Sequence, residues 1–217
     1  MKIKGFRYFL LVVLLLGLAG TAVAQPGGVP LPEDARELLP LYNGQVLYAR
    51  VRNVQEHPAV FNAIGLLDVA GKSLWVREMP DFRLSWRGLN ALFEGGFVVF
   101  ADTLDGQQQA WYFQDNGDLS AAINIPNDIK PVMATATGRL LGTRQGQEAA
   151  LVEITSAGVE PMNIPGLSPE STVQWTQPQG LSTLLWTRSP LSQEEDFTKR
   201  RADCWLTLLS PEGEVLL

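Results

Sequence analysis

Short apolar segments separated by polar turns run through the chain from residue 43 to its end, and they recur in a fixed order. Each unit has an apolar strand pair that opens at a glycine, a polar turn, another strand and a second glycine turn. The paired glycines are Gly44/Gly71, Gly96/Gly117, Gly138/Gly158 and Gly180/Gly213. The second glycines of successive units lie 41 to 55 residues apart, which is the spacing of propeller blades with four short strands each.

Several of these strands are apolar on both faces. Residues 97–100 are Phe-Val-Val-Phe, and residues 184–186 are Leu-Leu-Trp. A sandwich strand with one wet face alternates, whereas a blade strand is covered on both faces by neighbouring blades. We therefore predict an all-β fold, a propeller-like repeat of about four four-stranded antiparallel blades. The predicted blades are 43–80, 84–126, 131–165 and 172–217. A β-sandwich is the alternative, disfavoured because sandwiches do not repeat at this period.

A proline recurs shortly after the second glycine turn of three units. Pro80, Pro126 and Pro165 each follow an apolar residue that closes a strand pattern. Proline cannot donate to a strand ladder, so each is expected at a strand end that leads into the next blade.

Residues 95–99, Gly-Gly-Phe-Val-Val, and residues 110–117, Ala-Trp-Tyr-Phe-Gln-Asp-Asn-Gly, carry a resemblance. They resemble the repeats of bacterial secreted β-propeller proteins, in which Gly-Gly-Phe-Val-Val precedes a polar turn, a strand and an Asp-x-x-Gly turn. The third unit departs from this pattern, since residues 138–141 lack the aromatic and residues 156–158 lack the acid. The resemblance implies a propeller and implies no single activity.

The first 24 residues have the features of a signal peptide. Lys2, Lys4 and Arg7 precede an apolar run over 9–19, and residues 22–24 are Ala-Val-Ala. Cleavage is predicted between Ala24 and Gln25, which makes the protein secreted or periplasmic. The apolar run is short for a membrane span, so no stable span is expected after cleavage; an uncleaved anchor is the alternative. Residues 25–42 are predicted to be a Pro/Gly linker followed by a short helical turn over 32–39.

The charge and the rarity of Cys and His exclude several classes of partner and cofactor. The whole chain has a net charge of −6, and removal of the three leader cations leaves −9, which makes nucleic acid a poor partner. Cys204 is the only cysteine and lies in an apolar run, so we expect it to be buried. With one His and one Cys, neither zinc nor any other cofactor is expected.

Candidate catalytic residues are scarce. His57 is the only histidine and no Gly-x-Ser-x-Gly elbow occurs, so no catalytic residue is assigned. The turn Asp115–Asp118 could offer oxygen ligands to calcium, but Asp, Asn and Gly are also the usual turn residues. Trp86 and Trp175, near the innermost strands, are the candidate ligand-binding residues for a carbohydrate or protein partner.

The fourth unit contains an insert at 189–203. Ser192 to Glu195 fits a capping box, and Glu195 and Lys199 stand at i,i+4. A short charged helix and an extended polar loop both fit. Because binding residues concentrate on such loops, the candidate partner-contact residues are Glu195, Lys199, Arg200 and Arg201.

The sequence thus predicts a secreted, non-enzymatic β-propeller module for binding or scaffolding. The alternative is the N-terminal propeller part of a larger secreted hydrolase or lyase. An enzyme should gather polar side chains at one mouth, and a binding module should present an apolar or aromatic patch. The chain ends at Leu217, four residues after Gly213, so we expect the front part of a longer propeller. Its last blade should then expose an apolar face and a strand edge.

Overall fold

The computed structural model describes residues 31–55, 57–144, 151–162, 164, 171–179, 182–189, 191–194, 198, 200–211 and 214–216, but not the side chains of 86, 87, 172 and 174–179. The chain divides into two units, Met1–Leu31 and Pro32–Leu217, and the second holds the strands. The predicted signal peptide and most of the linker lie outside the described residues.

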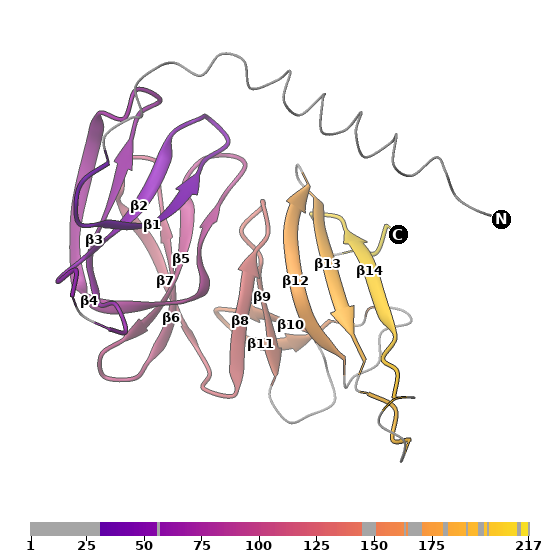
Figure 1. Ribbon diagram of the computed structural model, residues 1–217. Helices are drawn as coiled ribbons and strands as arrows, with labels where there is room; N and C mark the ends of the chain where they lie inside the picture. The colour runs from indigo at the N-terminus through magenta and orange to yellow at the C-terminus, as the bar shows by residue number, and fades with distance from the viewer. Residues whose placement is uncertain are drawn as a thin grey trace, which may run out of the picture. The chain divides into compact units, whose positions relative to one another are not determined.

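The second unit is all-β, and every strand pair is antiparallel (Figure 1). No helical segment in the described ranges has the length and hydropathy that a membrane crossing needs. The strands are β1 (Ala35–Pro40), β2 (Val46–Val51), β3 (Phe61–Leu67), β4 (Ser73–Ala91), β5 (Phe97–Thr103), β6 (Gln108–Phe113), β7 (Leu119–Ile125), β8 (Ile129–Ala134), β9 (Leu140–Arg144), β10 (Val152–Thr155), β11 (Gly158–Pro161), β12 (Thr172–Gln179), β13 (Ser182–Arg188) and β14 (Cys204–Leu209).

Consecutive strands pair to form three meander sheets. The first has the order β1-β2-β3-β4-β5-β6-β7, the second β11-β10-β9-β8 and the third β12-β13-β14. Beyond β14, Val215 forms a bridge to Leu209, and the N–H of Leu216 donates to the carbonyl of Leu208. These two contacts place residues 215–216 beside the end of β14.

The seven-stranded sheet corrects the expectation of separate sheets for the first two units. β4 pairs with β3 through its first half and with β5 through its second half. Pro80 does not end the strand, because it falls where the β3 register shifts between the pairs Ala63–Glu78 and Phe61–Phe82. A register irregularity tolerates the missing N–H of proline, so the ladder continues past it.

The expected helical turn over 32–39 is wrong beyond its first residues. The N–H of Ala35 donates to the carbonyl of Pro32, which makes a single turn. From Ala35 the chain is strand β1, paired with β2, and Leu39 packs against the apolar core. Pairing with β2 and burial of this side chain outweigh a weak local helix signal.

One five-residue turn closes most hairpins. In each, the N–H of the first residue donates to the carbonyl of the fifth, and the N–H of the fourth, a glycine, donates to the carbonyl of the first. These glycines have φ between +80° and +107°, which other residues adopt at a cost. The turns are 41–45, 68–72, 92–96, 103–107, 114–118 and 135–139.

The first sheet folds on itself at β4, so that its two halves pack face to face. Leu47 and Ile64 from the first half meet Phe97 and Trp111 from the second, and Phe82 of β4 lies in the same cluster. We call the first half, β1 to the start of β4, layer 1, and the rest of β4 to β7 layer 2. The sheets β8–β11 and β12–β14 are layers 3 and 4.

Apolar clusters also join layer 2 to layer 3 and layer 3 to layer 4. Val98 and Phe100 of layer 2 pack with residues of β9 and β10, while Leu185 of layer 4 packs with residues of β8 and β9. The prediction that residues 97–100 are buried on both faces is confirmed, because Phe97 and Val99 belong to the cluster with layer 1. Each inner layer is thus covered on both sides.

Candidate functional site

The two predicted binding tryptophans lie on the first strands of their layers. Trp86 is on β4 and Trp175 is on β12, but both side chains lie outside the described ones. The strand register nevertheless places Trp175 opposite Trp186 of β13. The backbone therefore brings one candidate beside a tryptophan whose side chain is described.

Layer 4 has one buried and one exposed face. Leu185 and Leu209 point toward layer 3 and are fully buried. On the other face, Trp186 is 42% exposed and its register partner Leu206 is 56% exposed. We call the four adjacent leucine and tryptophan positions on the outward side of β13 and β14 the end face: Leu184, Trp186, Leu206 and Leu208.

The end face was only partly anticipated. The apolar run 184–186 was expected to be covered on both sides, and this is wrong, since no cluster of described residues covers Trp186. Trp186 and Leu206 are exposed instead, so the sheet β12–β14 presents an apolar face. The sequence signal for this face is the apolar run at residues 184–186.

Cys204 lies on the same side of β14 as the end face, two residues before Leu206. The expectation that it is buried is wrong, because its free thiol is exposed. The cause is its register: Cys204 pairs with Arg188 at the outward side of β13. The Cys204 thiol can therefore be labelled with a chemical probe at the edge of the end face.

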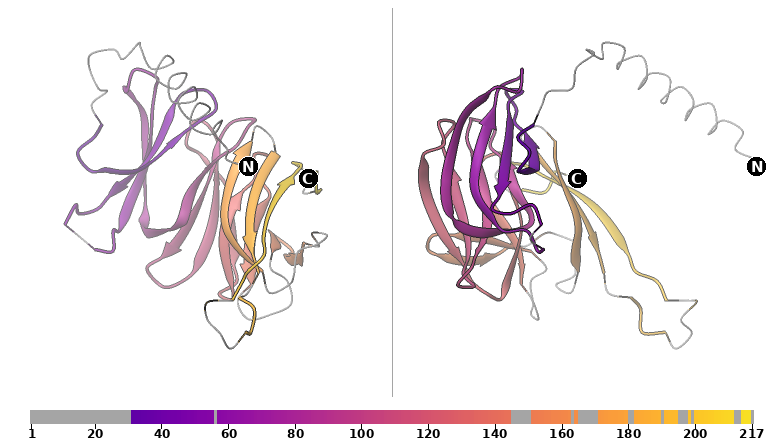
Figure 2. Two further views of the ribbon diagram at one scale, coloured as in Figure 1. Left: turned by 45° about the vertical axis from the view of Figure 1, so that its right-hand side comes forward. Right: turned by 60° about the vertical axis from the view of Figure 1, so that its left-hand side comes forward.

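The insert between β13 and β14 projects beyond the ends of these strands (Figure 2). Its described base continues the hairpin. The N–H of Ser189 donates to the carbonyl of Asp203, and the N–H of Ser192 donates to the carbonyl of Arg201. The hydroxyl of Ser192 accepts a hydrogen bond from the N–H of Arg201. This hydroxyl therefore stabilises the hairpin, and at the base of the insert the extended loop is favoured over the helix.

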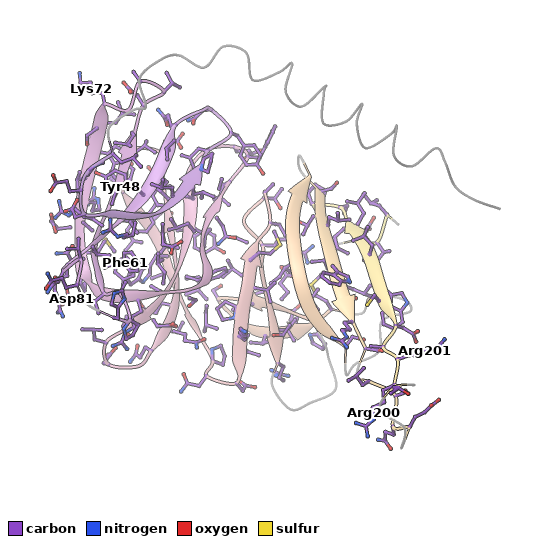
Figure 3. The ribbon with its side chains drawn as sticks, in the orientation of Figure 1. Tyr48, Phe61, Lys72, Asp81, Arg200 and Arg201 are labelled. Carbon is purple, nitrogen blue, oxygen red and sulfur yellow. The ribbon has the colours of Figure 1, made fainter. Side chains whose placement is uncertain are left out.

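The four predicted partner-contact residues are only partly described. Glu195 and Lys199 lie outside the described residues. Arg200 donates from Nε to the carbonyl of Glu194 at 2.8 Å, and Arg201 is exposed. Figure 3 shows Arg200 and Arg201 on the insert, in a different part of the unit from Tyr48 and Phe61 of layer 1.

Layer 1 also has an outward face. The register forms a row across its four strands, Leu38–Tyr48–Gly65–Val76. Leu38 and Val76 at the two ends of the row are 48% and 41% exposed, whereas Tyr48 between them is 1% exposed and Gly65 is buried. The ring of Tyr48 lies over Gly65, where a Cβ would come within 2.4 Å of it. We call this row, with the exposed Leu74, the start face.

Ion pairs border the start face. Arg50 binds Asp34 and Glu78, and Arg52 binds Asp81. The Glu78 carboxylate is exposed, and Glu78 lies one row beyond Val76 along β4. The apolar row thus ends in charged side chains near the loop end of the layer.

A hydrogen-bonded group crosses from layer 2 to layer 3. The hydroxyl of Tyr112 donates to the carbonyl of Gly138 at 2.8 Å, and Arg139 donates from Nε and Nη2 to the two carboxylate oxygens of Glu153. Burial, and then the Glu153 carboxylate, raise the pKa of Tyr112 to about 12. Burial also raises the pKa of Tyr42. A phenol that keeps its proton at neutral pH acts here as a structural donor.

The turn Asp115–Asp118 uses its oxygens within the protein. The Asp115 carboxylate accepts the N–H of Gly96, and its backbone carbonyl accepts Nε1 of Trp75. Asp118 binds Arg77. Over the described ranges, no three His, Cys, Asp or Glu side chains come together as a metal site would need. These contacts support the turn interpretation over calcium binding.

Two further surface features are smaller. A groove of about 330 Å³ separates β7 from residues 154–159, and Asn124 in its wall accepts a hydrogen bond from Gln109. On the turns, the exposed rings of Tyr42 and Phe93 meet edge to face at 5.6 Å. In the groove, the side chains of Asn124 and Thr155 already hydrogen-bond within the protein, to Gln109 and to the carbonyl of Gly158, so no ligand is assigned to either feature.

Comparison with protein families and with curated proteins finds no match. Among solved structures, the chain is similar to a protein of unknown function from Bacteroides caccae, with 17% sequence identity and a TM-score of 0.45. The similarity covers 87% of this chain and 68% of that chain. A likeness this distant supports no conclusion about fold or function.

Proposed function

We propose that this chain is a secreted, non-enzymatic β-propeller module that binds a protein partner through its end face. The proposal rests on the exposure of Trp186 and Leu206 on a sheet whose opposite face packs against layer 3. Apolar patches on folded, rigid elements mark interaction sites. The four side chains that define the end face are apolar, and Arg188 lies at its edge on the same side of β13.

Three observations support the propeller arrangement. The layers follow one another in chain order, each inner layer is covered on both faces, and each is an antiparallel meander. The first turns of layers 1 to 3 also meet, since Tyr42 contacts Phe93 and the N–H of Phe93 donates to the carbonyl of Ala136. Inner turns converge in this way when blades radiate from an axis.

The chemistry of the end face favours a protein over a carbohydrate. Three of its four side chains are leucines, and only Trp186 offers a flat ring. A sugar site sets hydrogen-bonding side chains beside its aromatic rings, whereas aliphatic side chains around one aromatic anchor are typical of protein interfaces. In the part of the chain that the structure describes, no observation favours the hydrolase or lyase alternative.

Position-specific crosslinking tests this function. A benzophenone is attached to Cys204 of the secreted protein, which is mixed with envelope proteins of its source organism and irradiated. The matched control carries the probe at Leu104→Cys in a Cys204→Ser background, because Leu104 is an exposed turn residue elsewhere. We expect adducts from Cys204 alone, lost with Leu206→Asp. Equal adducts at both positions, or adducts indifferent to Leu206, contradict the proposal.

A further inference from the structure

Two of the hairpin turns contain the same reactive dipeptide. Asn43-Gly44 and Asn116-Gly117 each occupy the third and fourth positions of a five-residue turn. A glycine after an asparagine leaves the peptide nitrogen between them unhindered, because glycine has no side chain. That nitrogen can attack the amide carbon of the asparagine, and this attack starts spontaneous deamidation. From sequence alone, the two asparagines are therefore expected to react alike.

The hydrogen bonds inside the two turns also match. The glycine N–H donates to the carbonyl of the first turn residue at 3.0 Å for Gly44 and at 2.9 Å for Gly117. The asparagine Oδ1 accepts the N–H of the residue two positions on, at 3.1 Å for Asn43 and at 2.9 Å for Asn116. In each turn the asparagine Nδ2 donates to the side chain of that same residue. The two dipeptides thus form a matched pair whose surroundings differ.

The surroundings of Gly117 enclose the reactive peptide. Gly117 is buried, and a ring carbon of Trp75 lies 2.9 Å from the position that a Cβ would take there. The same indole donates from Nε1 to the carbonyl of Asp115, and Asp118 binds Arg77. Opening this turn therefore breaks contacts with layer 1, and the indole shields the peptide nitrogen from water.

The surroundings of Gly44 leave the reactive peptide accessible. Asn43 and Gly44 are both exposed. The nearest atom to a Cβ at Gly44 would be Cγ1 of Val69 at 3.2 Å, and Val69 is itself 74% exposed. A side chain in solvent moves aside readily, so the turn can open here without breaking a buried contact at the dipeptide.

We propose that Asn43 is a site of spontaneous deamidation in the folded protein, while the Trp75 indole protects Asn116. Hydroxide removes the proton of the Gly44 N–H, and the nitrogen forms a bond to Cγ of Asn43. The Cγ–Nδ2 bond then breaks, and ammonia leaves with a proton from water. Water opens the cyclic imide at either carbonyl, which gives aspartate or isoaspartate. The reaction needs no oxidant and no reductant.

Deamidation at Asn43 should loosen the contact between the first turns of layers 1 and 2. The same turn holds Tyr42 edge to face against Phe93 at 5.6 Å. Isoaspartate lengthens the backbone of the turn by a methylene carbon, which is incompatible with its two closely spaced hydrogen bonds. This site lies on layer 1 and does not rest on the proposed function of the end face.

Peptide mapping by mass spectrometry tests the proposal on the secreted protein, incubated in mildly alkaline buffer. In the folded protein, Asn43 should convert at least about tenfold faster than Asn116. In urea, the two should convert at rates within about threefold of each other, because the protecting contacts are gone. Asn43→Gln should remove most of the acidic form that ion exchange detects, because glutamine cyclises much more slowly than asparagine.

Equal rates in the folded protein overturn the proposal. So does conversion of both asparagines in urea with none at Asn43 in the folded protein, because the turn itself would then protect. A difference that persists unchanged in urea would come from the sequence and not from the fold, and also overturns it.

Replacing Trp75 tests the cause of the protection. Trp75→Ala should raise the rate at Asn116 at least about tenfold and leave the rate at Asn43 unchanged, in buffer where circular dichroism shows a folded protein. Trp75→Phe keeps a ring over Gly117 and should give a smaller rise; it takes the place of Trp75→Ala if that variant does not fold. An unchanged rate at Asn116, or a parallel rise at Asn43, contradicts protection by the indole.

Discussion

Trp75 of β4 donates a hydrogen bond from Nε1 to the backbone carbonyl of Asp115 at 2.9 Å. The bond fastens layer 1 to the turn 114–118 of layer 2. The same indole stacks on Phe97 at 6.0 Å and lies over Gly117, where a Cβ would come within 2.9 Å of the ring. Trp75 of the first repeat and Gly117 of the second therefore form one packing contact.

Replacing Trp75 separates the hydrogen bond from the packing. Trp75→Phe should lower the free energy of unfolding by about 1 kcal/mol, because the Asp115 carbonyl loses its donor. Trp75→Ala should lower it by about 3 kcal/mol, because the stack on Phe97 is lost as well. Urea denaturation measures both, with Leu104→Ala as a control that should stay near wild type. A Trp75→Phe protein as stable as the wild type would show that the bond contributes nothing.

Gly96 and Gly106 form a matched pair for testing the turns. Both have positive φ, +78° and +86°. A Cβ at Gly96 would lie 2.2 Å from the carbonyl oxygen of Phe113, whereas a Cβ at Gly106 would meet no atom within 4 Å. Gly106→Ala should therefore cost about 1 kcal/mol for the backbone conformation alone.

Gly96→Ala should cost about 3 kcal/mol or more, because the backbone itself must shift. The difference between the two melting curves reports the close approach of β5 to β6. Equal losses of stability in the two variants would mean that the approach at Gly96 is absent in solution.

Tyr112 should make stability fall at alkaline pH. Its pKa in the folded protein is raised to about 12, above about 10 for an unfolded tyrosine. The unfolded state therefore loses this proton first, and the stabilisation, complete below about pH 10, is lost as the pH rises toward 12. Tyr112→Phe should flatten this decline in urea titrations at increasing pH.

Glu153→Gln gives a second test of the same group. Removing the carboxylate lowers the pKa of Tyr112, because Glu153 is one of the two causes of its rise. Phenolate absorbance of the folded protein should then appear at lower pH than in the wild type. An unchanged titration would show that Glu153 does not act on Tyr112.

The insert should be the first site of tryptic cleavage, after Lys199 or Arg200. The backbone pairing at its base reaches Ser192 and Arg201, and residues 191–194 are exposed. Few buried contacts favour local opening. Mass spectrometry of a short digest identifies the cut, and Arg77, within β4 and paired with Asp118, should be cleaved at least about tenfold more slowly. First cleavage elsewhere would argue that the insert is docked.

The turns and the apolar strands could be predicted because their causes are local. A glycine at the fourth position of a five-residue turn meets a backbone requirement within the hairpin itself. The double burial of 97–100 follows from composition, since four consecutive apolar side chains leave neither strand face polar. The repeat period then indicates an ordered series of similar layers.

Tertiary contacts decided the rest. Pro80 is locally a strand end, but β4 continues because both β3 and β5 pair with it. Residues 32–39 have weak helical features, but the edge of β2 and the core beneath Leu39 select a strand. Cys204, taken as buried from its apolar neighbours, is exposed because its register partner is Arg188 on the outward side.

The difference between local causes and tertiary contacts also explains why the end face is exposed while other apolar strands are buried. By itself the sequence determined which positions are apolar, where the chain turns and that the pattern repeats, because these depend on side-chain chemistry and on backbone freedom over a few residues. Only the tertiary structure decided that Leu185 is covered while Trp186 is not. Whether a given apolar face meets water depends on which layer packs against it, and that layer comes from a distant part of the chain.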